Sequence, residues 1–152
     1  MGIGKMVKKI FLLLFVFFLL GHSRGFGDKK AMPVLTHADA AVMLAKYSGF
    51  FDRYVSEDAD LNECVAFLNK TGIYFGLLEV VNGDEFTLDD CAMAMGQIEL
   101  VLRGEAVFSS GKVSLPHGLD SWREYCTINE VKFVEAYQTM LGMLRVAYEQ
   151  SE

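Results

Sequence analysis

The stretch "TLDDCAMAMGQIELVL", residues 87–102, decides the fold. Thr87 with Asp90 three residues later has the pattern of a capping box, which marks the start of a helix. Apolar residues continue after it at helical spacing until Gly104, a residue type that commonly ends helices. We therefore predict a helix over residues 87–103, against which the rest of the chain must pack.

Three further helices are predicted on either side of this one. The first, over residues 36–55, has Thr36 as its cap and an apolar stripe at helical spacing. The second opens at Ser56 with acidic residues in its first turn, where the helix dipole favours them, and runs to the "NG" at 82–83. Gly72 and Gly76 weaken its interior and indicate either a kink or a close helix crossing.

The last helix is predicted to begin at a second capping box, Thr127 with Glu130, and to continue to the C-terminus. The connection before it, Glu105–Ser121, is the only long one and is rich in Gly, Ser and Pro, with at most a short β-ladder over 105–118. The predicted fold is all-α: a four-helix bundle with one long loop between helices three and four, preceded by a signal peptide.

The N-terminus has the layout of a secretory signal. Three lysines precede an apolar run of eleven residues, Ile10–Leu20, and small residues follow. That run is shorter than the roughly 20 residues that cross a bilayer as a helix, so an uncleaved anchor is the alternative and not the expectation. With cleavage after Gly27, residues 1–27 are a signal peptide and 28–152 a single helical domain, periplasmic or secreted, with no stable membrane insertion.

The charge balance limits the partners. Residues 28–152 contain ten Lys and Arg against twenty Asp and Glu, a net charge of −10. Such a chain repels nucleic acid and anionic membrane surfaces. Basic proteins, neutral ligands and cations are the partner classes that remain.

The three cysteines of the exported part, Cys64, Cys91 and Cys126, allow one pair and one remaining thiol in an oxidising compartment. If helices two and three form a hairpin, Cys64 and Cys91 lie at opposite ends, beyond the about 7 Å between Cα atoms that a disulfide spans, unless Gly72 breaks helix two. We expect a Cys91–Cys126 disulfide, which would anchor the long loop, and a free, buried Cys64. A Cys64–Cys126 bridge is the alternative and would mean the opposite orientation of helix four.

Metal and catalytic chemistry are not indicated. Met93 and Met95 are two residues apart, so on a helix they point away from each other and cannot join Cys91 on one metal without unwinding. A nucleophile pair drawn from Cys126 and His117 is explained better as a disulfide cysteine and a surface-loop histidine. We therefore predict no enzyme, no catalytic residue, no metal and no cofactor.

Two segments resemble a known family. In "CAMAMGQIELVL" a cysteine precedes a glycine by five residues, and "WREYCTINEVKFVEAYQTMLGML" follows about thirty residues later. Their order is similar to that of the small secreted helical proteins of the Rap/Tai type, which include immunity proteins against type VI secreted peptidoglycan amidases. That family usually has Cys-x-Gly-Tyr in the first motif and a proline after the second cysteine; here Ala92, Met93 and Ala94 replace the former, and Thr127 and Ile128 stand at the latter. The resemblance covers roughly residues 60–148. It implies the Cys91–Cys126 disulfide and inhibition by binding, without catalysis.

The function expected from these features is that of an exported, non-enzymatic protein that binds another protein. Its specific form would be an immunity protein that inhibits a secreted, basic cell-wall amidase. The alternatives are a periplasmic stress or holdase chaperone and a small-ligand carrier in the bundle core. These features are also compatible with a homodimer.

The long loop is the expected partner-binding surface, because long loops on rigid scaffolds are where such surfaces are built. It presents an apolar residue among polar ones; the candidates are Phe108, Ser109, Ser110, Lys112 and His117. The alternative is that Phe108 packs onto the bundle and the loop is only a connector.

Overall fold

The computed structural model describes residues 31–151. The chain divides into two units, Met1–Met32 and Pro33–Glu152, and all the helices and strands described below belong to the second. The predicted signal peptide, residues 1–27, lies outside the described residues. No helix between residues 31 and 151 is both long enough and apolar enough to cross a membrane.

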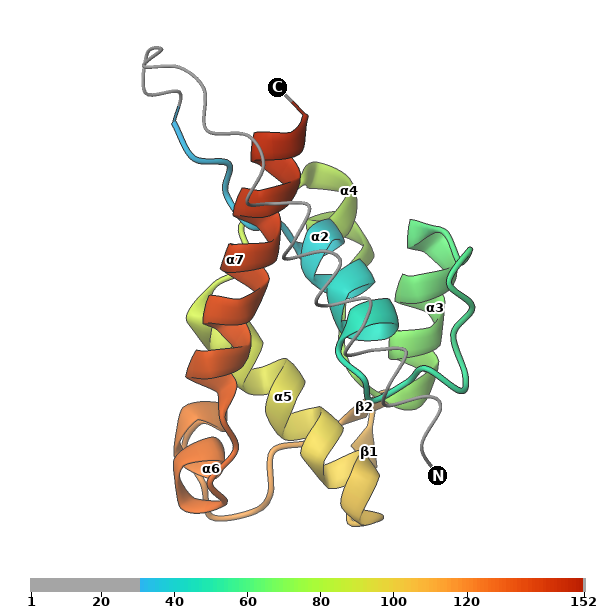
Figure 1. Cartoon of the computed structure of the whole chain (residues 1–152). Helices are drawn as coiled ribbons and strands as arrows, with labels where there is room; N and C mark the ends of the chain where they lie inside the picture. Colours follow the sequence, from blue (N-terminus) through green and yellow to red (C-terminus); the bar gives the residue numbers. More distant parts are fainter. Residues whose placement is uncertain (1–30, 152) are drawn as a thin grey trace, which may run out of the picture. The chain divides into compact units, whose positions relative to one another are not determined.

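The second unit is mostly helical, as predicted, but its described residues form six α-helices and not four (Figure 1). In chain order the elements are α2 (His37–Val42), a π-helical turn η1 (Met43–Tyr47), α3 (Leu61–Thr71), α4 (Leu77–Asn82), α5 (Leu88–Arg103), β1 (Phe108–Ser109), β2 (Lys112–Val113), α6 (Trp122–Ile128) and α7 (Phe133–Gln150). The two strands form an antiparallel hairpin within the long loop, with Phe108 opposite Val113.

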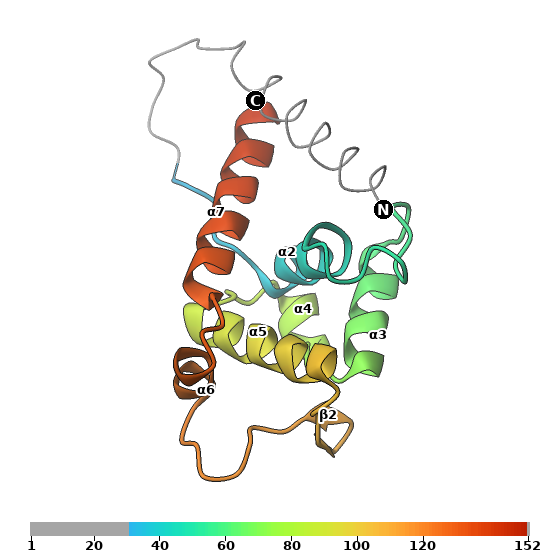
Figure 2. The ribbon, with the colours of Figure 1, turned by 60° about the horizontal axis from the view of Figure 1, so that its bottom comes forward.

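Helix α5 is the central element and has the predicted bounds. The Thr87 hydroxyl accepts a hydrogen bond from the Asp90 N–H, and the Asp90 side chain accepts one from the Thr87 N–H, which completes the capping box. Gly104 ends the helix in the left-handed conformation, with φ of 70°. In Figure 2, α6 and α7 lie at one end of α5 and the hairpin at the other; α5 contacts all three. Half of its residues are buried, because neighbours lie against it on more than one side.

The predicted second helix is in fact two helices. Asp60, and not Ser56, caps α3 through a capping box with Glu63. Gly72 then ends α3 with φ of 95°, a conformation that glycine adopts without strain. The chain runs on as a short connector, residues 73–76, before α4 begins, so the two glycines mark a full break instead of a kink.

The predicted start of the last helix is also wrong. Thr127 belongs to α6, where its hydroxyl donates to the Arg123 carbonyl, and α6 is capped by Ser121. The Val131 N–H bonds to the Cys126 carbonyl at 2.8 Å, which closes the end of α6. Glu130 turns the chain with φ of 55°, and α7 begins only at Phe133.

Candidate functional site

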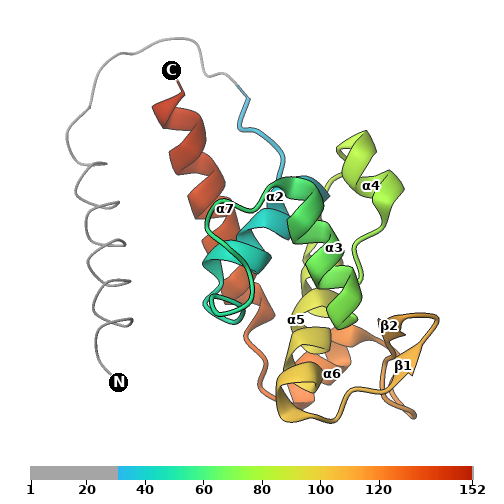
Figure 3. The ribbon, with the colours of Figure 1, turned by 90° about the vertical axis from the view of Figure 1, so that its right-hand side faces the viewer.

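A groove lies where the hairpin meets the connector between α3 and α4. It has a volume of about 480 Å³. Its lining comes from three segments that are distant in sequence: the end of α3, the connector with the first turn of α4, and the turn of the hairpin. Figure 3 shows α4 and the hairpin on the same side of the unit, with this connector between them. The lining residues are Asn69, Tyr74, Phe75, Gly76, Leu77, Leu78, Glu79, Ser110, Gly111 and Lys112.

Exposed apolar side chains line this groove and continue along α4 beyond it. Leu77, Leu78 and Val81 on α4 are 68%, 73% and 81% exposed, and Tyr74 beside them is 40% exposed. Leu77 and Val81 are one helical turn apart, so together with Leu78 they form one continuous outward face of α4. We call Tyr74, Leu77, Leu78 and Val81 the α4 face. Contiguous exposed apolar side chains of this kind mark interaction sites on soluble proteins.

Two side-chain amides hold the connector in place. The Asn69 side chain donates to the Phe75 carbonyl at 2.9 Å and accepts from the Phe75 N–H at 2.8 Å. It thus satisfies both backbone polar groups of Phe75, as a neighbouring strand would. From α5, the Gln97 side chain accepts a hydrogen bond from the Tyr74 N–H at 2.9 Å. The connector therefore has a fixed backbone although it belongs to no helix or strand.

The hairpin is held against the same region. The Val113 N–H donates to the Gly72 carbonyl at 2.8 Å, which attaches β2 to the end of α3. The Phe108 ring lies over Gly72, where a Cβ atom would come within 2.4 Å of its Cε1. The Lys112 ammonium is 4.6 Å from the centre of the Tyr74 ring, a cation–π contact across the groove. Three contacts therefore hold the hairpin in place: a backbone hydrogen bond, the packing of the Phe108 ring on Gly72, and the cation–π contact between Lys112 and Tyr74.

The predicted loop residues are only partly brought together. Ser110 and Lys112 line the groove, and Ser109 is exposed beside them. Phe108 is expected either to face a partner or to pack onto the bundle, and it does part of each. It is 56% exposed, and one part of its ring packs on Gly72 while the other faces solvent. His117 is exposed but is not among the lining residues.

The α4 face is not predicted by the sequence pattern. A single helix over residues 56–83 would carry Leu78 and Val81 on its apolar stripe, whereas the structure places both on the surface. A signal is nevertheless present: in "LLEVV", residues 77–81, four of five residues are apolar and cover a wide face of a short helix, bounded by Gly76 and the "NG" at 82–83. So short a helix cannot bury all of them against one neighbour.

The electrostatic surroundings are acidic. Residues 31–151 contain eight Lys and Arg against eighteen Asp and Glu. Lys112 and Glu79 are the charged residues that line the groove. Because these two residues carry opposite charges, the long-range field at this face is set by the surplus of carboxylates on the rest of the unit.

A second hollow, of about 500 Å³, lies at the turn between α6 and α7. Its lining runs from Cys126 to Glu135, so it is the inside of one bend and not a meeting of distant segments. Within residues 31–151 there is no group of three His, Cys, Asp or Glu side chains placed to hold a metal ion.

The structure does not contain the predicted Cys91–Cys126 disulfide. Cys64, Cys91 and Cys126 are all free and fully buried. The Cys91 thiol donates to the Phe133 carbonyl at 3.4 Å, and the Cys126 thiol to the Ala92 carbonyl at 3.3 Å, so each has a partner other than the opposite sulfur.

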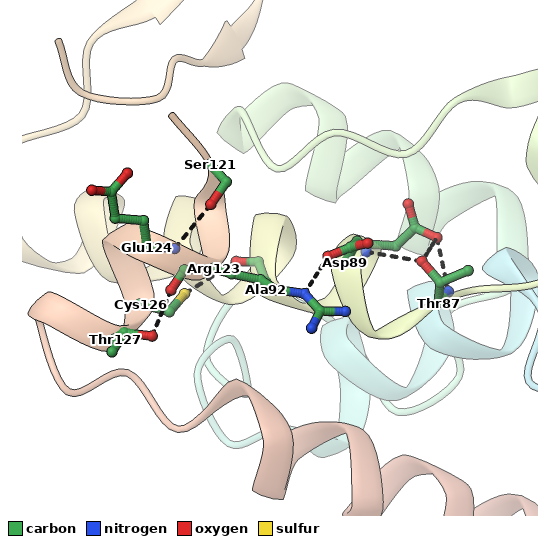
Figure 4. Close-up of polar contacts among 9 residues, drawn as sticks. Thr87, Asp89, Ala92, Ser121, Arg123, Glu124, Cys126 and Thr127 are labelled. Atoms are coloured by element: carbon green, nitrogen blue, oxygen red, sulfur yellow. Dashed lines mark hydrogen bonds and ion pairs between the residues drawn. The ribbon is translucent and has the colours of Figure 1, made fainter. Parts of the chain in front are cut away.

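The expected proximity of α5 and α6 is nevertheless found. Figure 4 shows Cys126 beside Ala92, the residue after Cys91, and Arg123 of α6 paired with Asp89 of α5. The packing of α6 across the first turns of α5 therefore needs no covalent link. Its contacts are a buried thiol–carbonyl bond, an ion pair and apolar side chains.

Burial suppresses the ionisation of these thiols. It raises the pKa of Cys91 to about 12, and the nearby Cys126 and Asp90 add to the effect. It raises the pKa of Cys126 to about 11, with a smaller contribution from the Glu99 carboxylate. Because the thiolate is the reactive form of cysteine, the native protein should react slowly with alkylating reagents.

These pKa values predict a loss of stability at alkaline pH. The unfolded thiols ionise near pH 9.0, whereas the folded ones stay protonated to about 12 and about 11, so ionisation favours the unfolded chain. The thiol contribution is complete below about pH 9 and is lost as the pH rises toward 11–12. Each pKa unit corresponds to about 1.4 kcal/mol.

Urea denaturation at pH 8 and pH 11, with a reductant present, measures this loss. A Cys91→Ala/Cys126→Ala variant is the control, because it retains the tyrosines but not the two thiols. The variant should lose clearly less stability than the wild type between the two pH values. Equal losses would show that other groups cause the dependence.

Comparison with known proteins adds no assignment: no protein-family model, no curated protein and no solved structure matches the chain.

Proposed function

We propose that this chain is an exported, non-enzymatic protein-binding protein and that the α4 face, with the groove beside it, is its docking surface. The observation that carries the proposal is the position of Tyr74, Leu77, Leu78 and Val81, which expose apolar area around a groove whose walls are already fixed. A surface that is ordered before binding loses less conformational entropy when a partner docks.

The partner that fits best is a basic protein with an apolar anchor. The surplus of ten acidic over basic residues in 31–151 attracts a positively charged protein and speeds its association. An apolar side chain of that protein would then enter the groove between Leu78 and Lys112. The resemblance to the Rap/Tai proteins supports a specific form: an immunity protein that covers a secreted cell-wall amidase.

A holdase chaperone is the second candidate. The same exposed apolar side chains favour it, because a chaperone that captures unfolded proteins needs such a surface. The two candidates differ in selectivity: an immunity protein should capture one folded enzyme at a fixed stoichiometry, whereas a holdase should capture many unfolded proteins.

The test compares Leu78→Glu with Ile128→Glu in capture from periplasmic extract, followed by titration of the captured protein. Both residues are exposed, at 73% and 63%, but Ile128 lies on α6 and does not line the groove. We expect Leu78→Glu to weaken binding by about tenfold or more, the loss that follows when about 1.4 kcal/mol of contact is removed. Ile128→Glu should bind as the wild type does.

Both substitutions lie on the surface, so both variants should melt within a few degrees of the wild type. Lys112→Glu extends the test to the opposite wall of the groove. If Leu78→Glu and Lys112→Glu both bind normally, the docking surface lies elsewhere and the proposal is wrong.

A further inference from the structure

Gln97 is the only buried side chain in the described part of the chain that carries an amide or a charged group, with 1% of its surface exposed. Leu, Met or Ile would fill the same space in a helix whose other inward residues are mostly apolar. A buried amide is retained without a free-energy cost only when its donor and its acceptor are both satisfied. The two partners of Gln97 therefore indicate why an amide stands at this position.

The two ends of this amide reach the two walls of the groove. The Gln97 Oε1 accepts from the Tyr74 N–H at 2.9 Å, and Tyr74 belongs to the connector wall. The Gln97 Nε2 donates to the Val113 carbonyl at 3.0 Å, and Val113 follows Lys112 in the hairpin wall. Both bonds span many residues of sequence, 23 and 16 respectively, so neither is a local turn contact.

The hairpin lies between two irregular stretches of chain, residues 104–107 and 114–121. A backbone bond joins it to the helical part, from the Val113 N–H to the Gly72 carbonyl at 2.8 Å. The Gln97 side chain donates to the carbonyl of Val113 itself. Val113 is therefore bonded to the end of α3 through its N–H and to α5 through its carbonyl.

We propose that Gln97 is a positioning residue, which holds the connector and the hairpin at a set separation and thereby fixes the shape of the groove. The inference rests on the proposed function only in that this groove is the docking surface. An apolar residue at the same position would preserve the core while leaving the Tyr74 N–H and the Val113 carbonyl without their partner. The walls would then move independently of a folded helical body.

The test is amide hydrogen exchange, measured residue by residue by NMR on the full chain, for the wild type, Gln97→Met and Gln97→Glu. Met has a similar length but forms neither bond. Glu keeps an oxygen that can accept from Tyr74, and in its ionised form it has no donor for the Val113 carbonyl. The matched control is Gln138→Met, which makes the same change at an exposed position on α7.

In Gln97→Met we expect the Tyr74 and Val113 amides to exchange about tenfold faster or more, while amides in the middle of α5 and α7 keep their wild-type rates. In Gln97→Glu the Val113 amide should be accelerated more than that of Tyr74. Gln138→Met should change neither. Unchanged exchange at Tyr74 and Val113, or equal acceleration throughout the fold, would overturn the inference.

If Gln97→Met does not fold, the wild type still decides the matter. The side-chain amide protons of Gln97 should then be protected to the same degree as the Tyr74 N–H, because one opening exposes both. Rapid exchange of the Gln97 side chain beside a protected Tyr74 would contradict the proposal. No partner is present in these measurements. A failed capture experiment would therefore contradict the proposed docking surface but not the proposed role of Gln97.

Discussion

Phe75→Ala is expected to lower the free energy of unfolding by about 3–5 kcal/mol, as truncation of a buried phenylalanine commonly does. Phe75 is 1% exposed and stacks in parallel on Phe86, with 5.8 Å between ring centres. The His37 ring meets both of them edge-on, at 6.3 and 5.3 Å. The three rings join the connector, the start of α2 and the segment that leads into α5, so the cavity would lie where three segments meet.

Urea denaturation followed by far-UV circular dichroism measures this effect. Leu77→Ala is the matched control, two residues further along the same segment but 68% exposed, and it should change stability by less than about 0.5 kcal/mol. A small effect of Phe75→Ala would mean that the aromatic cluster is not a main part of the core. A large effect of Leu77→Ala would mean that the α4 face is packed in solution.

The second large effect is expected at Gly96, where α5 and α6 approach closely. A Cβ atom at this position would lie 2.6 Å from Cε3 of Trp122 and 3.2 Å from Cδ1 of Tyr125, and ring atoms cannot bend away as the end of a flexible side chain can. Gly96→Ala should therefore destabilise the protein by about 1–3 kcal/mol through overpacking. It should also separate α6 from α5, which near-UV circular dichroism of Trp122 would report.

Gly142→Ala supplies the control of opposite sign. Gly142 is in α7, is exposed, and has no atom within 4 Å of a Cβ placed on it. Alanine there should stabilise the helix by about 0.5–1 kcal/mol, because glycine is the poorer helix former. If both substitutions stabilise the protein, the contact between α5 and α6 is looser than the structure indicates.

Several elements can be predicted because their causes are local. Thr36 with Asp39 and Thr87 with Asp90 form capping boxes from residues three apart, and Gly104 ends α5 through its own backbone freedom. The short ladder expected in the loop forms around Ser110 and Gly111, the two residues with positive φ at its turn.

Other predictions fail where non-local bonds overrule a local pattern. "TINE" has the spacing of a capping box, but the bond from Val131 to the Cys126 carbonyl ends α6 there and delays α7 to Phe133. The Cys91–Cys126 pairing follows from the expected proximity of the two segments, which is found, whereas the separate carbonyl partners of the two thiols depend on how α6 and α7 pack on α5.

The sequence by itself determined the helical class, the bounds of α5, the acidic charge and the long loop, since composition, capping and glycine act over a few residues. Only the tertiary structure decided that α3 and α4 are separate and that α4 turns Leu77, Leu78 and Val81 outward. The physical reason is that Gly72 and Gly76 permit a break without requiring one. The break is fixed by two hydrogen bonds from side-chain amides to the backbone, one between Asn69 and Phe75 and one between Gln97 and Tyr74. The second of these bonds joins residues 23 positions apart.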